Sequence, residues 1–132
     1  MVFPVITSFY AAILSLIFAA LSVWVSIGRF HFNALHGDGG IETLNRRIRA
    51  HGNFAEYVPL ILLLIALLEA GGTHPWVVRT LLLILVVARL MHPIGMVAPI
   101  GSLRQYAFRA TSTTATWCVL IVSATLLLVR FA

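Results

Sequence analysis

The stretch that decides the fold is RRIRAHGNFAEYVP, residues 46–59, where charged and amide side chains run directly into an apolar segment. This segment, residues 53–70, approaches the length of about 20 residues that a helix needs to span a bilayer core. Charged and amide groups are costly in hydrocarbon, so those that enter a spanning helix usually mark a functional site. We therefore expect residues 46–59 to determine what the protein does.

The whole chain has the composition of an integral membrane protein. Of its 132 residues, 61% are hydrophobic and only 10% are charged, whereas a soluble domain typically carries about 25% charged residues. Further apolar stretches cover residues 2–27, 75–91 and 113–131. Because lipid cannot satisfy unpaired backbone groups, each stretch predicts a helix. We expect an all-α integral membrane protein, a four-transmembrane-helix bundle forming one domain over residues 1–132, with helices at approximately 4–28, 45–70, 75–94 and 104–130.

Glycines and prolines predict where these helices end. Gly71-Gly72 is a stop signal for the second helix, and Pro75 suits the first turn of the third. His92-Pro93, Gly95 and Pro99 predict a break or kink at the end of the third helix, followed by a short loop over residues 96–102. The first apolar stretch is too long for a cleavable signal peptide and has no basic residue before Arg29, so we expect it to remain as a membrane helix.

The charges predict the orientation of the chain. The net charge of +5 comes from nine arginines, with no lysine. Six arginines lie in or next to the first and third connections, and the positive-inside rule places both connections in the cytoplasm and both termini on the opposite side. These six are Arg29, Arg46, Arg47, Arg49, Arg104 and Arg109. A basic nucleic-acid-binding protein needs a polar surface, which this chain lacks, so we expect no nucleic-acid partner.

A helical projection places several polar side chains of residues 46–57 on one face. At about 100° per residue, Asn53, Glu56 and Tyr57 fall roughly 40°, −20° and 80° from Arg49, and Arg46 falls at about 60°. His51 points almost the opposite way. A cation, an amide, an anion and a phenol in this order suit a zwitterionic, peptide-like ligand. The alternative is an internal Arg49–Glu56 ion pair that neutralises the helix entrance.

The third and fourth helices add further candidates. Arg89 and His92 are spaced i, i+3 and share a face; Arg89 lies deep in an apolar run and needs an anionic partner, for which Glu56 and Glu69 are available. Arg89 is either a structural counter-ion or a ligand contact, and His92 is either a core histidine or a ligand contact. Arg104 at the start of the fourth helix would favour a nearby anion such as a thiolate, because the helix dipole there is already positive; alternatively it is a topology signal.

Other chemistries find little support in the sequence. We find no metal-ligand spacing, no glycine-rich phosphate loop and no serine–histidine–acid pattern, and we expect no metal site. A small four-helix drug transporter of the proton-coupled kind would need an acidic residue in the middle of its first helix, and this chain has no acidic or basic side chain between Met1 and Gly28.

The pattern Arg49-Ala50-x-x-Asn53-x-x-Glu56-Tyr57-x-Pro59 resembles the membrane-associated proteins in eicosanoid and glutathione metabolism (MAPEG) family, which includes microsomal glutathione transferases and leukotriene C4 synthase. Ala88-Arg89-Leu90 with His92 is similar as well. The resemblance covers essentially the whole chain and points to a bacterial member. It implies a homotrimer that holds glutathione between the helices of adjacent subunits, near the cytoplasmic side of the inner membrane.

The resemblance also implies roles for individual residues. Arg104 would be the catalytic residue that stabilises the glutathione thiolate. The glutathione-binding residues would be Arg29, Arg49, His51, Asn53, Glu56, Tyr57, Arg89 and His92. The chain departs from the family pattern in two ways: Met96 stands where catalytic relatives often have a tyrosine, and the stretch from Met96 to Arg104 is one residue longer.

From the resemblance we expect an enzyme that conjugates glutathione, its co-substrate, to lipophilic electrophiles and that also reduces lipid hydroperoxides. The tripeptide would enter from the cytoplasm and the lipophilic substrate from the bilayer. The alternative within the same family is a non-catalytic scaffold that binds a lipid or glutathione; Met96 and the uncertain register of Arg104 support it.

Overall fold

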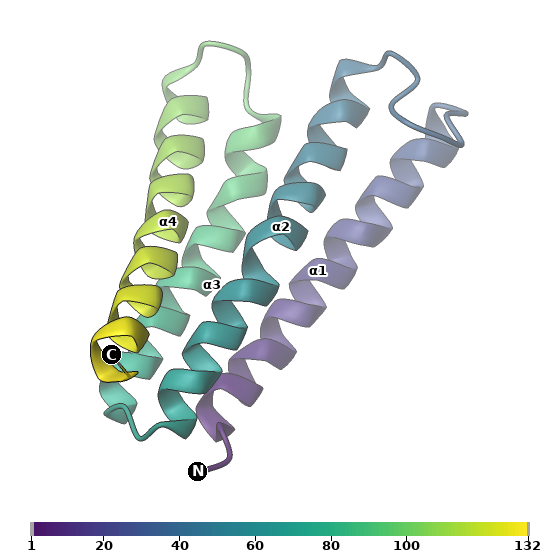
Figure 1. Cartoon of the computed structure of the whole chain (residues 1–132). Coiled ribbons are helices and arrows are strands. Elements are labelled where there is room, and N and C mark those ends of the chain that lie inside the picture. The colour runs from purple at the N-terminus through teal and green to yellow at the C-terminus, as the bar shows by residue number, and fades with distance from the viewer. Residues whose placement is uncertain (1, 132) are drawn as a thin grey trace.

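Four long helices make up the structure (Figure 1), a computed structural model that describes residues 2–131, the last of these by its backbone alone. In chain order the helices are α1 (Val5–His31), α2 (Glu42–Ala70), α3 (Pro75–Val97) and α4 (Leu103–Phe131). Each is long and apolar enough to cross a membrane. The predicted all-α, four-transmembrane-helix fold is confirmed.

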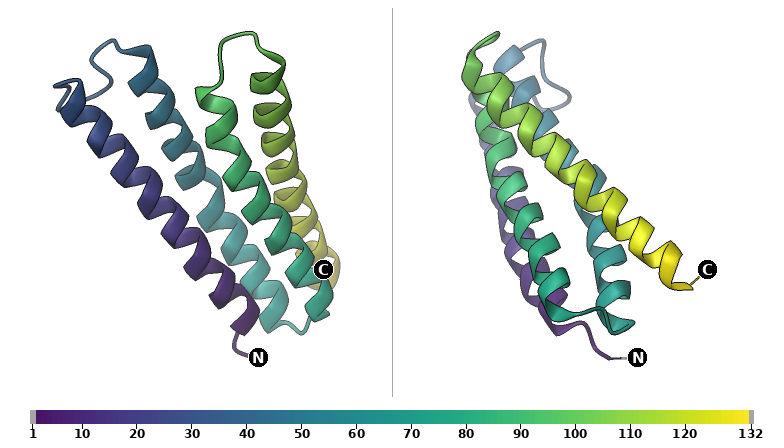
Figure 2. Two further views of the ribbon diagram at one scale, coloured as in Figure 1. Left: turned by 180° about the vertical axis from the view of Figure 1, so that it is seen from behind. Right: turned by 90° about the vertical axis from the view of Figure 1, so that its left-hand side faces the viewer.

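The two inner helices organise the bundle. α2 and α3 pack against each other and each contacts both outer helices, whereas α1 and α4 make no contact with one another within residues 2–131. The α1–α2 and α3–α4 connections lie at one end of the bundle, and both chain ends lie toward the other (Figures 1 and 2). Six arginines lie in the helix ends that flank these two connections, so they share one side, as the charge pattern predicts: Arg29, Arg46, Arg47, Arg49, Arg104 and Arg109.

The predicted break is wrong at His92-Pro93, because α3 continues through Pro93 and Gly95 to Val97; the alternative of a kink there stays a prediction. Proline has no backbone N–H, so Pro93 leaves the carbonyl four residues before it, that of Arg89, without its helical partner. Val97 is the last helical residue of α3, and the next residue, Ala98, has an extended backbone (φ −63°, ψ 153°). This ending has a direct cause, since Ala98 precedes Pro99 and the proline ring disfavours the helical conformation in the residue before it.

The α1–α2 connection, residues 32–41, is a tight turn-rich loop. Gly37, Gly39 and Gly40 all have positive φ, which only glycine adopts without steric cost. Asp38 accepts hydrogen bonds from the backbone N–H of Gly40 (2.9 Å) and from the side-chain amide of Asn45 (2.6 Å). These two donors stabilise the carboxylate and hold the pKa of Asp38 below its usual value. The loop is thereby joined to the first turn of α2.

Apolar side chains fill the centre of the bundle and also cover its outside. The buried cluster draws on all four helices: Leu14, Leu21, Phe54, Val58, Ile61, Ile65, Leu68, Val78, Leu81, Leu82, Leu85 and Val119. Large apolar side chains such as Leu16, Leu63 and Leu128 point outward and are exposed. This distribution suits a bundle whose surroundings are lipid, since lipid tails are as apolar as the core.

Glu69, near the end of α2, caps the start of α1. Its carboxylate accepts hydrogen bonds from the backbone N–H of Ile6 and Thr7 (2.8 Å each) and from the Thr7 hydroxyl (2.6 Å). The residue before α1, Pro4, offers no side-chain cap. The anion at a helix N-terminus satisfies donors that the helix leaves free, and the helix dipole favours its charge. Glu69 is thus occupied and is not a partner of Arg89.

Replacing Glu69 by alanine should destabilise the bundle by about 1–3 kcal/mol, because two backbone donors at the start of α1 lose their partner. We expect a lower midpoint of thermal unfolding in detergent, followed by circular dichroism. Glu42→Ala is the matched control, since Glu42 is exposed and pairs only with Arg46. Equal midpoints for the two variants would contradict the capping role.

Candidate functional site

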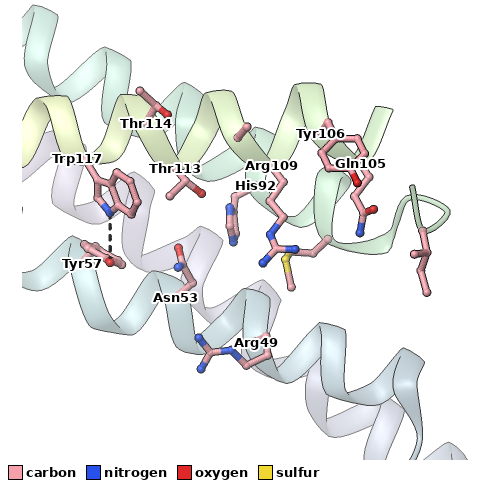
Figure 3. Close-up of a pocket in the computed structure, with 13 residues that line it drawn as sticks. Arg49, Asn53, Tyr57, His92, Gln105, Tyr106, Arg109, Thr113, Thr114 and Trp117 are labelled. Atoms are coloured by element: carbon pink, nitrogen blue, oxygen red, sulfur yellow. Dashed lines mark hydrogen bonds between the residues drawn. The ribbon is translucent and has the colours of Figure 1, made fainter. Parts of the chain in front are cut away.

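A cavity of about 730 Å³ opens between α2, α3 and α4, at the end of the bundle that carries the α1–α2 and α3–α4 connections (Figure 3). Its volume lies within the range of roughly 300–1,000 Å³ that is typical of small-molecule sites. Its lining is mixed, with two arginines, two tyrosines, a histidine and several amides and hydroxyls among apolar side chains. The lining residues are Arg49, Asn53, Tyr57, His92, Met96, Ile100, Gln105, Tyr106, Arg109, Ala110, Thr113, Thr114 and Trp117.

The α2 wall of the cavity is the polar face found in the sequence. Arg49, Asn53 and Tyr57 follow one another at intervals of four residues and all line the cavity. Glu56 lies beside this face, and its carboxylate is 3.6 Å from the Arg49 guanidinium. Both side chains are more than half exposed (59% and 53%), so solvent screens their attraction and the pair is weak. The Arg49–Glu56 ion pair, predicted as the alternative to a ligand-binding face, is present, and Arg49 also lines the cavity.

Arg46 does not belong to the cavity, although the projection placed it near the same face. Its guanidinium bonds to Glu42 (2.8 Å) and donates to the backbone carbonyls of Ala98 (3.0 Å) and Met96 (3.4 Å) at the end of α3. A cation at a helix C-terminus satisfies free carbonyls and is favoured by the helix dipole. Arg46 consequently ties the start of α2 to the end of α3.

Arg89 is buried between three helices and has no carboxylate partner among the residues that the structure describes. With 1% of its surface exposed, its guanidinium donates to the Asn53 side-chain oxygen (2.8 Å), to the Thr116 hydroxyl, and to the backbone carbonyl of Ser112 (3.5 Å). Neither Glu56 nor Glu69 pairs with it, which corrects the expectation of an anionic partner. Both acidic side chains have nearer partners, and neutral acceptors on α2 and α4 replace them.

The bond to Arg89 fixes the orientation of the Asn53 side chain. Because the Asn53 oxygen accepts from the guanidinium, the amide nitrogen keeps its two hydrogens for other partners. Asn53 lines the cavity, so its free donors are available to a ligand there. In the single chain Arg89 is therefore a positioning residue for Asn53.

His92 and Ser112 connect α3 to α4 beneath the cavity. His92 Nδ1 lies 3.1 Å from the Ser112 hydroxyl, and that hydroxyl donates its hydrogen to the backbone carbonyl of Arg109 (3.0 Å). With its hydrogen so used, the hydroxyl accepts from Nδ1–H, and Nε2 of the neutral imidazole is an acceptor. His92 is 4% exposed and forms part of the cavity wall.

Arg109 and Trp117 of α4 are cavity residues that sequence reasoning did not assign to the site. Arg109 reaches from α4 toward α2, and the Trp117 indole N–H donates to the Tyr57 hydroxyl (3.2 Å) across the far end of the cavity (Figure 3). The sequence does carry a signal for them. Spacings of four residues place one stripe of α4 on the cavity, the same periodicity that marks the face of α2. The stripe is Gln105, Arg109, Thr113 and Trp117.

Three predicted site residues lie elsewhere in the single chain. Arg104 is exposed in the first turn of α4 and does not line the cavity. His51 packs against α1, where its ring stacks on Phe18 (4.6 Å between centroids) and its Nε2 lies 2.9 Å from the Ser22 hydroxyl. Arg29, in the last turn of α1, is half-buried and its Nε has no hydrogen-bond partner. Their roles toward a ligand stay predictions.

Within residues 2–131, no three histidine, cysteine, aspartate or glutamate side chains gather closely enough to hold a metal ion. The chemistry of the cavity comes instead from cations, amides, hydroxyls and aromatic rings. Such a lining suits an organic anion or zwitterion that has an apolar part.

Comparison with known sequences agrees with the resemblance carried by residues 49–59. The sequence model of the MAPEG family matches residues 7–129, which is nearly the whole chain. The chain belongs to the MAPEG family. It is also 32% identical over 117 residues to the inner membrane protein YecN of Escherichia coli strain K12, covering 89% of this chain and 86% of that protein, and the YecN sequence of strain O6:H1 matches equally well.

Thr116→Val should destabilise this MAPEG protein by about 1–3 kcal/mol, because the buried Arg89 guanidinium loses its hydroxyl acceptor while the side-chain shape is kept. The measurement is the thermal unfolding midpoint in detergent. Thr125→Val is the matched control: Thr125 is exposed on the same helix, and a surface substitution of this kind changes stability by at most about 0.5 kcal/mol. An equal response of both variants would argue against the buried bond.

Proposed function

We propose that the chain binds glutathione in the cavity between α2, α3 and α4 and conjugates its thiol to lipophilic electrophiles. The observation that carries this proposal is the convergence of four predicted glutathione-binding residues on one cavity of suitable volume: Arg49, Asn53, Tyr57 and His92. Membership of the MAPEG family supports it, because the family is associated with glutathione metabolism in membranes.

The lining, together with Glu56 beside it, offers a complementary group for each polar part of the tripeptide. Glutathione carries two carboxylates, one ammonium group and two amide bonds. Arg49 presents a planar fork that pairs with a carboxylate, the free Asn53 amide hydrogens meet a carbonyl or carboxylate oxygen, and the Tyr57 hydroxyl keeps its own hydrogen to donate, since it accepts from Trp117. Glu56, beside Arg49, would accept the ammonium group.

The second substrate would arrive from the bilayer. Beyond Trp117 the outward face of α4 is apolar, with Ile121 and Val122 exposed, so a lipophilic molecule approaches the cavity without leaving an apolar surrounding. In conjugation the thiolate sulfur forms a bond to an electrophilic carbon, and the displaced group leaves with the bonding electrons. In peroxide reduction two glutathione molecules give up two electrons and two protons, and the hydroperoxide becomes an alcohol and water.

One observation favours the alternative of a non-catalytic binding protein. Met96 lines the cavity, where catalytic relatives often have a tyrosine, and a thioether cannot donate a hydrogen bond to a thiolate. In that case the same cavity would bind glutathione or a lipid without activating a thiol. The two candidates differ in one measurable property, the ionisation of the bound thiol.

The proposal includes a homotrimer with a shared site. Arg29 and His51 lie on the α1 side of α2 and do not line the cavity of their own chain. They would contact glutathione only from a neighbouring copy, in which this side faces the cavity of the first. The similarity to an inner membrane protein supports a place in the bacterial inner membrane, with the arginine-flanked connections and the cavity mouth facing the cytoplasm.

Arg49→Gln should weaken glutathione binding at least about tenfold, because a charge-assisted bond contributes about 1.5–3 kcal/mol. The dissociation constant would be measured by calorimetric titration of the purified protein in detergent. Arg79→Gln is the matched control, since Arg79 is exposed near the opposite end of the bundle. The proposal fails if the unaltered protein does not bind glutathione.

The shared site can be tested by mixing subunits. Arg29→Gln and Arg49→Gln subunits alone should each form trimers with every site defective. When the two variants are co-produced, sites that combine Arg49 of one subunit with Arg29 of its neighbour are intact, so part of the binding returns. Native mass spectrometry would count the subunits. No recovery in confirmed mixed assemblies would contradict sharing through Arg29.

A further inference from the structure

We propose that a groove between α1 and α3 binds the acyl chain of an anionic phospholipid, with the headgroup phosphate against Arg47. The site is separate from the cavity between α2, α3 and α4, because none of the described residues lines both. It does not depend on glutathione binding. Three features support it: an apolar groove of suitable depth, a cation at its end, and its place on the outside of the bundle.

The groove has a volume of about 430 Å³ and is formed by side chains of α1 and α3. In the left view of Figure 2, these two helices move apart toward the end of the bundle with the α1–α2 and α3–α4 connections. The lining is apolar except for Arg89, which is almost fully buried. The apolar side chains include Ile17, Ala20, Trp24, Leu90, Ile94 and Val97.

The length of the groove matches one leaflet of a membrane. On α3 the lining extends from Arg89 to Val97, a rise of about 12 Å at 1.5 Å per residue. The hydrocarbon core of a bilayer is about 30 Å thick, so one leaflet has a depth of roughly 15 Å. Ala20, Leu90 and Val97 are exposed within the groove, which therefore opens to the surroundings of the bundle. It can hold most of one acyl chain that lies along the helices.

Arg47 of α2 lies at the end of the groove nearest the two connections. Its guanidinium carbon is 5.0 Å from the ring centroid of Trp24, which lines the groove. One turn further along α1, a Cβ at Gly28 would lie only 3.1 Å from Nη1 of Arg47. A side chain at Gly28 would thus push the guanidinium away from α1. The positive charge is thereby placed where the α1 wall of the groove ends.

The charge of Arg47 is not balanced by an anion within residues 2–131. The ion pairs of this part of the chain are Arg46–Glu42 and Arg49–Glu56, so the arginines on both sides of Arg47 have carboxylate partners. Among the same residues Arg47 makes no hydrogen bond, and its Nε is buried without a partner. The Trp24 ring attracts the cation but offers its N–H groups no oxygen acceptor. A phosphate would supply both the charge and the acceptors.

The groove stays on the outside of the bundle when the proposed shared site is taken into account. His51 contacts Ser22 on α1, and Ser22 and Trp24 are two residues apart, a rotation of about 200°. The side of α1 that would face a neighbouring copy in the proposed homotrimer is thus opposite to the groove. An acyl chain can therefore enter the groove directly from the lipid.

These features together select the occupant. Free phosphate would make no use of the apolar groove, and a neutral lipid would leave the charge of Arg47 unbalanced. An anionic phospholipid matches both parts, with its acyl chain between α1 and α3 and its phosphate at the end with the connections. The charge pattern predicts that this end lies at the cytoplasmic leaflet, whose anionic lipids attract basic side chains near the membrane surface.

The test compares phosphatidylglycerol with phosphatidylethanolamine of the same acyl chains. Each is titrated into the purified protein in detergent, and bound lipid is counted by native mass spectrometry. The unaltered protein should bind phosphatidylglycerol more tightly. Arg47→Gln should weaken this binding about fivefold, the loss expected for one arginine beside an anionic headgroup, and should change phosphatidylethanolamine binding less. Arg79→Gln, which removes an exposed arginine near the opposite end of the bundle, should bind both lipids like the unaltered protein.

A second pair of variants tests the groove without changing any charge. Ala20→Phe places a ring in the groove and should weaken phosphatidylglycerol binding at least as much as Arg47→Gln does. Ala19→Phe is the matched control, since Ala19 is exposed on the same helix and does not line the groove. Ala20 is exposed as well, so both variants are expected to fold, and circular dichroism checks this.

Glycerol phosphate, which carries the anion without an acyl chain, should not compete with phosphatidylglycerol. Equal binding of the two phospholipids, or competition by glycerol phosphate, would overturn the inference. The same conclusion follows if Arg79→Gln weakens binding as much as Arg47→Gln, or if Ala20→Phe binds like Ala19→Phe. None of these outcomes bears on glutathione binding, which is measured separately.

Discussion

A guanidinium buried without an anion is the constraint on which the site depends. Arg89 lies at the centre of the bundle and joins α3 to Asn53 on α2 and to Ser112 and Thr116 on α4. Burying an unpaired charge in an apolar bundle is costly, so each neutral acceptor around it becomes necessary. The same bonds hold the Asn53 amide in one orientation and set the spacing of α2, α3 and α4, between which the cavity opens.

The charged side chains that hold the helices together are different from those that line the cavity. Arg46 and Glu69 use their charges at helix ends, where free carbonyls or N–H groups need partners, and they leave the cavity to other groups. Arg49 and Arg109 then face a space without carboxylates. Such a space attracts anions, and the low dielectric of the surrounding bundle strengthens the attraction. The positive charge of the cavity therefore depends on the contacts at the helix ends, which keep Arg46 and Glu69 out of it.

The sequence predicts the fold and one wall of the site, for identifiable reasons. Helical periodicity places Arg49, Asn53 and Tyr57 on one face because all three belong to one helix. It cannot give the rotation of α4 relative to α2, because that depends on how the separate helices pack, so it indicates only a topology role for Arg109. The expected pairing of Arg89 with Glu56 or Glu69 was wrong for a related reason. An argument from charged side chains alone overlooks the free backbone N–H groups at the start of α1. Glu69 accepts hydrogen bonds from two of them and so does not pair with Arg89.

The hydrogen bond between Trp117 and Tyr57 has a consequence for substrate choice. It crosses the cavity between α2 and α4 at Tyr57 and Trp117, the lining residues farthest along their helices from the two connections. In the proposed site, glutathione would lie on the connection side of this pair, which the charge pattern predicts to face the cytoplasm. Its sulfur would then reach only those amphiphiles whose electrophilic atom lies at the same depth in the membrane. The tyrosine–tryptophan pair would in this way select lipids by the position of the reactive group along the chain.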